Sequence, residues 1–143
     1  MTPPQPDLSL TGKRVYVAGH LGMVGSALVR RLGAEDCTIL TASRAEADLV
    51  RQADVEAWMQ DHRPDIVIVA AAKVGGILAN DSYPAAFLYE NLMIEANLIH
   101  AAHKQNVDRL LFLGSSCIYP KFAPQPMPED ALLTGPLEDT NQW

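Results

Sequence analysis

The feature that most constrains the fold is a regular alternation of short apolar runs with longer stretches of helical periodicity. One run, IVIVAAA at residues 66–72, is apolar throughout, as in a strand covered on both faces. The expected strands are 14–18, 37–42, 66–72 and 109–114, and the expected helices are 23–32, 54–62 and 85–105. Such alternation forms right-handed βαβ units. It predicts an α/β fold with a doubly wound, Rossmann-like parallel sheet of about four strands.

Two residue types set the expected limits of these elements. Asp54 has a side chain suited to capping the helix at 54–62, and Pro64 ends that helical pattern. Five prolines lie between residues 120 and 136, so this part of the chain is expected to be mostly loop.

Composition and charge narrow the class of protein. The chain of 143 residues has a formal charge of −6 and no lysine or arginine run, which argues against a nucleic-acid partner. No apolar stretch reaches the roughly 18 residues of a membrane span. Residues 1–12 lack the basic flank and apolar core of a secretory signal, so we expect a disordered lead-in before one domain at 13–143. Cys37 and Cys117 have no framework spacing, which favours a reduced, cytoplasmic setting.

Three glycines join the first expected strand to the first expected helix. A helix N-terminus offers unpaired N–H groups and a partial positive charge, which together attract a phosphate. Gly19 can make the tight turn, Gly22 removes the Cβ that would block a diphosphate, and Gly25 lets the helix pack closely on the strand. A plain glycine-rich turn would use the same residues, but the strand before them and the helix after them are the context of dinucleotide binding.

The residues after the second expected strand indicate which dinucleotide binds. NAD-binding domains place a carboxylate there for the ribose 2′-hydroxyl, whereas this chain has Ser43 and Arg44. A hydroxyl and a guanidinium suit a 2′-phosphate, so the cofactor expected is NADP. The alternative is that Arg44 is simply a solvated loop cation.

The spacing G-x-x-G-x-x-G resembles the extended, sugar-nucleotide-modifying branch of the short-chain dehydrogenase/reductase superfamily. Three further stretches make the resemblance more specific: AAAKVGGILAN at 70–80, NLMIEANLIHAAH at 91–103, and FLGSSCIYPKFAPQPMPEDALLTGPLEDTNQW at 112–143. Together they resemble the GDP-L-fucose synthase family, the GDP-4-keto-6-deoxy-D-mannose 3,5-epimerase-4-reductases. The resemblance implies an NADPH-dependent enzyme that epimerises C3 and C5 of the GDP-4-keto sugar and then reduces its C4 ketone, giving GDP-L-fucose.

The resemblance also implies roles for individual residues. Ser115 matches the serine that hydrogen-bonds the C4 carbonyl, and Cys117 matches the cysteine that transfers protons during epimerisation. By residue pattern alone, Ser115 and Ser116 would form a turn at a strand end, and Cys117 would be a small buried filler. Asp48 and Leu49 fall where the branch contacts the adenine, although Asp48 could also cap a helix. The expected cofactor contacts are Gly19, His20, Leu21, Gly22, Met23, Val24, Gly25, Ser43, Arg44, Asp48, Leu49, Ala71, Ala72, Leu113, Gly114, Ser115 and Ser116.

Other polar residues support weaker interpretations. Residues 73–76 follow the third expected strand and would form a wall between cofactor and substrate, or an ordinary tight turn with Lys73 solvated. His100 and His103 are three residues apart on a helix, but no third ligand is evident, so no metal is expected. Glu129 and Asp130 are neighbours in the proline-rich loop and are expected to be solvated.

Two departures from the family pattern matter. Many bacterial members carry arginine where this chain has Leu21, which leaves Arg44 with more of the 2′-phosphate to hold. The superfamily uses a Tyr-x-x-x-Lys pair to protonate the C4 oxygen, and here no tyrosine has lysine four residues on. In the family that pair directly follows the segment that is residues 140–143 here. We therefore expect an N-terminal portion, inactive alone, with its sheet truncated after about four strands and without the C-terminal substrate domain.

Association and alternative functions complete the expectations. The resemblance implies a further strand beside the strand at 109–113 and a dimer-forming helical bundle around the helix at 85–105. Without them, the strand would be an exposed apolar edge and the helix would expose apolar residues such as Phe87, Leu92 or Ile99, so we expect a poorly soluble or self-associating chain. The complete protein is expected to be a homodimer that binds a GDP-sugar. Two other functions stay open: a non-catalytic NADP-binding module, and another extended-branch sugar-nucleotide epimerase, which Cys117 disfavours.

Overall fold

The structure is a computed structural model, and it describes residues 9–140. Residues 1–8 of the expected lead-in and residues 141–143 lie outside the described part. The rest of the lead-in forms a turn beside the sheet. There the Gly12 N–H donates to the Asp36 carbonyl at 2.8 Å, and Leu10 packs against the core.

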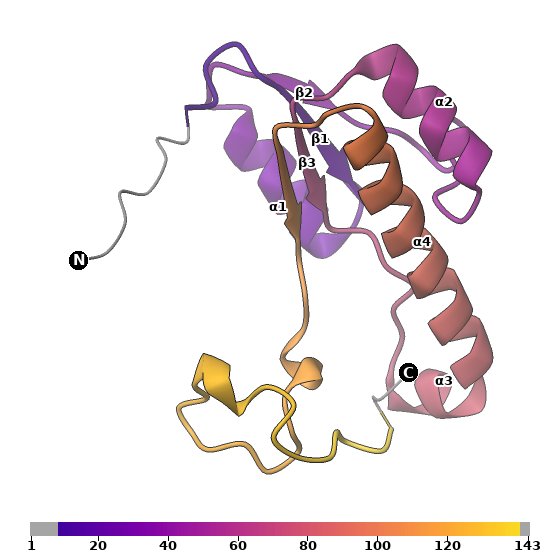
Figure 1. Cartoon of the computed structure of the whole chain (residues 1–143), viewed down its shortest axis with the longest axis vertical. Helices are drawn as coiled ribbons and strands as arrows, with labels where there is room; N and C mark the ends of the chain where they lie inside the picture. Colours follow the sequence, from indigo (N-terminus) through magenta and orange to yellow (C-terminus); the bar gives the residue numbers. More distant parts are fainter. Residues whose placement is uncertain (1–8, 141–143) are drawn as a thin grey trace.

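A four-stranded parallel sheet forms the centre of the described chain, with strand order β2-β1-β3-β4 (Figure 1). In chain order the elements are β1 (Arg14–Ala18), α1 (Met23–Leu32), β2 (Thr38–Leu40), α2 (Gln52–His62), β3 (Ile66–Val69), α3 (Ile77–Ser82), α4 (Pro84–Lys104) and β4 (Arg109–Phe112). The chain winds outward from β1 to β2, returns to place β3 on the other side of β1, and continues to β4. This reversal makes the sheet doubly wound and confirms the predicted fold class.

Different helices cover the two faces of the sheet (Figure 1). Val15 and Val17 of β1 are buried on one face together with Leu32 of α1. Tyr16 and Ala18 are buried on the opposite face, beneath α2 and α4. Because successive side chains of a strand point to opposite faces, burial on both sides explains the continuous apolar runs in the sequence.

Several element boundaries differ from the predicted ones. The N-cap of α2 is Arg51, so the prediction that Asp54 caps this helix is wrong; Asp54 lies in the first turn, where its carboxylate faces the positive end of the helix dipole. The run at 66–72 leaves the sheet after Val69, because β4 pairs with β3 only as far as Phe112. The sequence does not predict α3, a six-residue helix that packs against α4.

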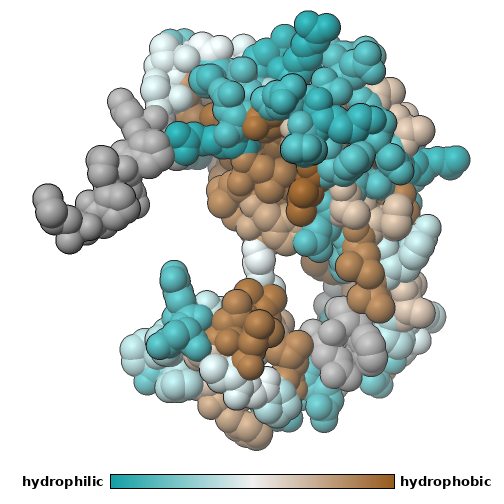
Figure 2. All heavy atoms as spheres, in the orientation of Figure 1, coloured by the Kyte–Doolittle hydropathy of each residue, from teal (hydrophilic) through white to brown (hydrophobic). Residues whose placement is uncertain are grey.

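The strand β4 is an exposed edge, as predicted. It pairs only with β3, and Leu111 and Phe112 are 52% and 43% exposed. The chain then leaves the sheet as a C-terminal segment, residues 113–140, with two short 3₁₀ turns at Ser116–Ile118 and Glu129–Ala131 (Figure 1). Figure 2 shows hydrophobic surface over β4 and on this segment, which is consistent with the predicted tendency to associate.

The long helix α4 exposes part of the predicted apolar surface. Leu92 and Ile99 are exposed, as predicted. The prediction for Phe87 is wrong: its side chain is buried, because the loop after β3 folds back over it and Gly75 lies against its ring. In the part of the chain described, none of the helices combines the length and the hydropathy needed to cross a membrane.

Candidate functional site

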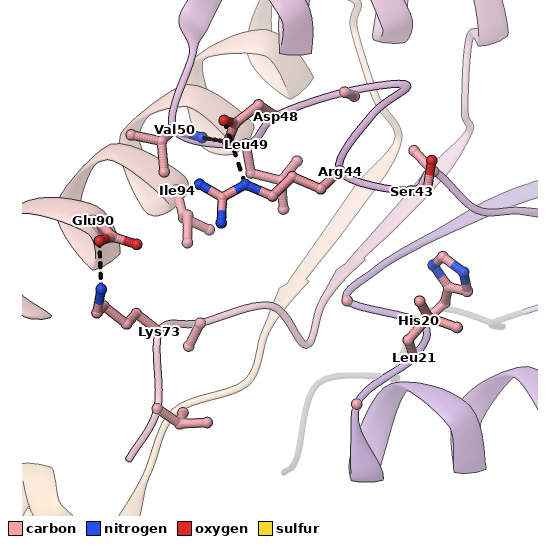
Figure 3. Close-up of a pocket in the computed structure, with 16 residues that line it drawn as sticks. His20, Leu21, Ser43, Arg44, Asp48, Leu49, Val50, Lys73, Glu90 and Ile94 are labelled. Carbon is pink, nitrogen blue, oxygen red and sulfur yellow. Dashed lines mark hydrogen bonds and ion pairs between the residues drawn. The ribbon is translucent and has the colours of Figure 1, made fainter. Parts of the chain in front are cut away.

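A cavity of about 490 Å³ opens at the carboxyl edge of the sheet (Figure 3). Its walls come from the loops that follow β1, β2 and β3, and from α4. It lies where the winding of the sheet reverses, between β2–β1 on one side and β3 on the other, which is the usual ligand site in such sheets. The lining residues are Gly19, His20, Leu21, Gly22, Ala42, Ser43, Arg44, Ala47, Asp48, Leu49, Val50, Ala72, Lys73, Val74, Glu90 and Ile94.

Two glycines allow the loop after β1 to pack as closely as it does. Gly19 has φ +85°, and a Cβ there would lie 2.6 Å from the Ala70 carbonyl oxygen. A Cβ at Gly25 would overlap the Gly19 carbonyl group and lie 2.9 Å from the His20 Cα. Both positions therefore exclude any side chain, since backbone atoms cannot rotate away. The first turn of α1 is held directly against the end of β1, as predicted for a dinucleotide loop.

Gly22 has a different environment, and it leaves the N-terminus of α1 open. It is the N-cap of α1, no side chain caps it, and the first turn contains no acidic residue. A Cβ at Gly22 would meet only the Gly19 carbonyl oxygen, at 3.4 Å, and the residue borders the cavity. Gly22 alone of these first residues lines the cavity, and the unpaired N–H groups of the first turn, at the positive end of the helix dipole, follow directly after it. This arrangement can hold a phosphate.

The loop after β2 brings Ser43 and Arg44 to the cavity, where the Ser43 side chain is hydrogen-bonded to a neighbour and the Arg44 side chain is largely exposed. The Ser43 N–H and hydroxyl both donate to Glu46 Oε2 at 2.7 Å, and the Glu46 N–H donates to the Ser43 carbonyl at 3.1 Å, so the two residues close a short turn. The two hydrogen bonds from Ser43 hold the pKa of the Glu46 carboxyl below its ordinary value, and the bond from the Ser43 backbone N–H has the larger effect. The hydroxyl hydrogen of Ser43 is thus already engaged. Arg44 is largely exposed, and its Nε lies 3.5 Å from Asp48 Oδ2 (Figure 3).

Asp48 and Leu49 also line the cavity, at the same end as Arg44. Asp48 Oδ1 accepts the Val50 N–H at 3.2 Å, which closes a turn before α2 begins. Asp48 caps that turn, while the N-cap of α2 is Arg51. Its other carboxylate oxygen is paired with Arg44, so the end of the cavity beside β2 contains one cation matched by one anion.

The loop after β3 forms the opposite wall and is tied to α4. The Lys73 Nζ lies 2.5 Å from Glu90 Oε1, and the same ammonium lies 5.6 Å from the centre of the Phe87 ring. The Asn91 side chain bonds both backbone groups of Lys73. Lys73 is therefore a half-buried, paired residue of the wall rather than a solvated cation.

The segment after β4 lies at the same edge of the sheet but outside the cavity. Ser115 Oγ accepts the Cys117 N–H at 3.2 Å, which is the strand-end turn that the residue pattern predicts. Both side chains are exposed, so Cys117 is not a buried filler. Among the expected cofactor contacts, the cavity lining omits Met23, Val24, Gly25, Ala71, Leu113, Gly114, Ser115 and Ser116.

Sequence reasoning missed several lining residues. Ala42, Ala47 and Val50 lie beside the predicted contacts of the β2 loop and could have been found by extending that segment. Glu90 and Ile94 come from α4. Their spacing of four residues puts them on one helix face, but nothing local in the sequence shows that this face meets the loop after β3.

No metal site is present in residues 9–140: the described histidines, cysteines and acids form no group of three or more. His100 and His103 are both exposed on α4, and His100 Nε2 lies 3.8 Å from Glu56 Oε1 of α2. Glu129 and Asp130 are exposed, in agreement with the prediction that they are solvated.

The fold and the site together define a class of protein. A doubly wound parallel sheet whose first βα turn is a glycine loop with an open helix N-terminus belongs to a dinucleotide-binding protein. The comparison with known sequences agrees, since the model of the NAD dependent epimerase/dehydratase family matches residues 15–143. The chain belongs to this family.

Individual relatives confirm the more specific resemblance. The chain is 59% identical over 138 residues to a GDP-L-fucose synthase of Sinorhizobium fredii, covering 96% of this chain and 44% of that protein. It is 53% identical over 134 residues to the GDP-L-fucose synthase of Escherichia coli, covering 93% and 42%. A solved structure of MlghC, a GDP-mannoheptose C4 reductase from Campylobacter jejuni with NADP bound, matches with TM-score 0.85 at 38% identity, covering 90% of this chain and 41% of that one. The chain thus spans less than half the length of these relatives.

Proposed function

We propose that this chain is the NADP-binding portion of a GDP-L-fucose synthase. The whole protein would convert GDP-4-keto-6-deoxy-D-mannose to GDP-L-fucose by 3,5-epimerisation followed by reduction of the C4 ketone. The observation that carries the proposal is the open N-terminus of α1 on the cavity wall, in a chain 59% identical to a GDP-L-fucose synthase. We expect the 143-residue chain to bind cofactor without turnover, because it contains no Tyr-x-x-x-Lys pair.

The residues present fit a dinucleotide along the cavity. The diphosphate would lie on the first turn of α1, where Gly22 leaves room for it. The adenosine half would extend past Arg44 towards Leu49, and the other half would lie on the β3 side, beside Lys73 and Val74. When bound, NADPH supplies the hydride that reduces the C4 ketone.

The 2′-phosphate would be held mainly by Arg44. Its guanidinium can pair with a phosphate through two parallel hydrogen bonds, and it borders the cavity on a largely exposed side chain. Ser43 already donates its hydroxyl hydrogen to Glu46, and Leu21 provides no polar group. Binding the phosphate would require Arg44 to exchange its contact with Asp48 for the new anion.

Ser115 and Cys117 would act on the sugar. Ser115 Oγ accepts the Cys117 N–H, so its own O–H remains free to donate to the C4 oxygen. A donor there would stabilise negative charge on that oxygen, both when a proton leaves C3 or C5 and when hydride arrives at C4. The Cys117 thiol would exchange protons with those carbons, because a thiol can act as a general acid and, once ionised, as a general base.

We also propose that the complete protein is a cytoplasmic homodimer that associates through α4. The supporting observations are the exposed apolar side chains of Leu92 and Ile99 on this helix, and the two free thiols, Cys37 and Cys117. Sedimentation of the complete protein would report its oligomeric state.

The cofactor assignment is tested by titrating the chain with NADPH and NADH and following nicotinamide fluorescence. We expect NADPH to bind more tightly. Arg44→Ala should weaken NADPH binding by roughly ten- to a hundredfold, as expected for a charged hydrogen-bonded contact, and leave NADH binding unchanged. Arg30→Ala, on an exposed position of α1, is the matched control. A preference of the unaltered chain for NADH would contradict the proposal.

A further inference from the structure

The cavity has two walls that lie far apart in the sequence, and α4 contacts both of them. One wall is the loop after β3, with Lys73 and Val74, and the other is the turn before α2, with Asp48, Leu49 and Val50. Neither segment belongs to a helix or strand. Their positions must therefore be fixed by contacts with a neighbouring element.

Asn91 of α4 holds the wall after β3. Its Oδ1 accepts the Lys73 N–H at 2.7 Å, and its Nδ2 donates to the Lys73 carbonyl at 3.0 Å. One side-chain amide thus satisfies both backbone groups of one residue, as a neighbouring strand would. Lys73 follows shortly after the chain leaves the sheet at Val69, so this pairing continues the alignment of the loop beyond the strand.

Asn97 of α4 holds the turn before α2. Its Nδ2 donates to the Leu49 carbonyl at 2.9 Å, across 48 residues of sequence. Asn97 is only 4% exposed, and it is the single buried polar or charged residue of the described chain. A polar group buried among apolar neighbours costs stability unless it is hydrogen-bonded, so this contact has a defined geometry rather than a fluctuating one.

We propose that Asn91 and Asn97 are positioning residues that set the two walls of the cofactor cavity, Asn91 at the nicotinamide end and Asn97 at the adenine end. This inference rests on the NADP site proposed above. Ile94 lies midway between the two asparagines and itself lines the cavity. A single rigid helix therefore fixes the separation of two loops that have no direct hydrogen bond to each other among the described contacts.

The two asparagines should affect different parts of the ligand. The fragment 2′,5′-ADP reaches only the adenine end, whereas NADPH reaches both ends. Asn97→Asp replaces the donor to the Leu49 carbonyl with an oxygen, so 2′,5′-ADP and NADPH should both bind about tenfold more weakly. Asn91→Asp keeps the acceptor for the Lys73 N–H but removes the donor. It should leave 2′,5′-ADP affinity within about twofold, weaken NADPH by roughly three- to tenfold, and reduce the rise in nicotinamide fluorescence.

The experiment measures both affinities by calorimetry for each variant of the chain, with thermal unfolding as a check of folding. Glu95→Gln, an exposed one-group change on the same helix, is the control. Asn97→Leu is a second variant, because leucine has the same branched arrangement of heavy atoms as asparagine, suits the apolar surroundings and still lacks the donor. It should also weaken 2′,5′-ADP.

The outcomes separate this inference from the cofactor site on which it rests. If the unaltered chain bound neither ligand, the site itself would be wrong, and the assignment of the asparagines with it. If the unaltered chain bound both ligands, the positioning roles alone would be overturned by Asn97 variants that lost no affinity for 2′,5′-ADP. They would also be overturned by an Asn91 variant that lost no affinity for NADPH, or lost as much for 2′,5′-ADP as for NADPH.

Discussion

Gly22 and Gly25 lie three residues apart at the start of α1. The structure predicts that alanine at Gly25 lowers the stability of the fold, whereas alanine at Gly22 weakens cofactor binding and hardly changes stability. At Gly25 a Cβ would overlap the Gly19 carbonyl group and approach the His20 Cα to 2.9 Å. Overpacking against atoms that cannot rotate away costs about 3 kcal/mol or more. The better helix propensity of alanine offsets about 1 kcal/mol of this. The net loss of roughly 2–3 kcal/mol should lower the Tm by about 10 °C in a domain of this size.

At Gly22 the same methyl group should hardly affect folding. The backbone there is extended (φ −71°, ψ 170°), and a Cβ would make one ordinary contact at 3.4 Å. Losing glycine at an N-cap costs about 1 kcal/mol at most. The Cβ would, however, project towards the place proposed for the diphosphate. Loss of one or two charge-assisted hydrogen bonds to backbone N–H groups should weaken NADPH by roughly ten- to a hundredfold.

The assay is a pair of measurements on each variant: thermal unfolding by circular dichroism, and NADPH binding by fluorescence. Gly22→Ala should melt near the unaltered chain and bind poorly, whereas Gly25→Ala should melt early. The reasoning would be refuted by a Gly22→Ala chain that binds NADPH normally. It would also be refuted by a Gly25→Ala chain with an unchanged Tm, because the close approach of α1 to the end of β1 would then not exist in solution.

Two further predictions concern the surface. Leu111→Lys places a charge on the exposed edge strand β4 and should reduce self-association of the chain. Light scattering would measure this as a fall in mean particle mass, and an unchanged mass would show that this edge is not the contact. Burial, and to a smaller extent the neighbouring acids, raises the pKa of the Cys37 thiol. A thiol reagent at neutral pH should therefore modify the exposed Cys117 first, and Cys37 only on unfolding or at higher pH. Peptide mass mapping over time would show this order.

The sequence contained enough information for the elements whose signals are local. The strands follow from short, continuous apolar runs and the long helices from a period of 3.6 residues, while the glycine loop follows from the steric demands of one turn. The prediction of β1 and α1 is correct to the residue, because β1 is buried on both faces and α1 begins at a glycine.

What the sequence could not predict depends on contacts between distant segments. The position of Phe87 on α4 does not by itself show whether its side chain is exposed, and only the return of the loop at Gly75 buries it. The hydrogen bonds of Ser43 to Glu46, three residues later, are likewise not visible in the residue pattern that places Ser43 beside a phosphate. The bond from Asn97 to Leu49 spans 48 residues, so no local pattern encodes it.

The pairing of charges around the cavity has a consequence for how an anionic ligand would arrive. The lining contains two basic and two acidic side chains, and each cation already contacts an acid: Arg44 with Asp48, and Lys73 with Glu90. The rim is thus electrically balanced, on a chain whose formal charge is −6. A multiply charged phosphate ester would feel no long-range pull towards it, so encounter should be slow compared with electrostatically guided association. Discrimination between ligands would arise only after contact, when the Arg44–Asp48 ion pair is replaced by a pair between Arg44 and the phosphate.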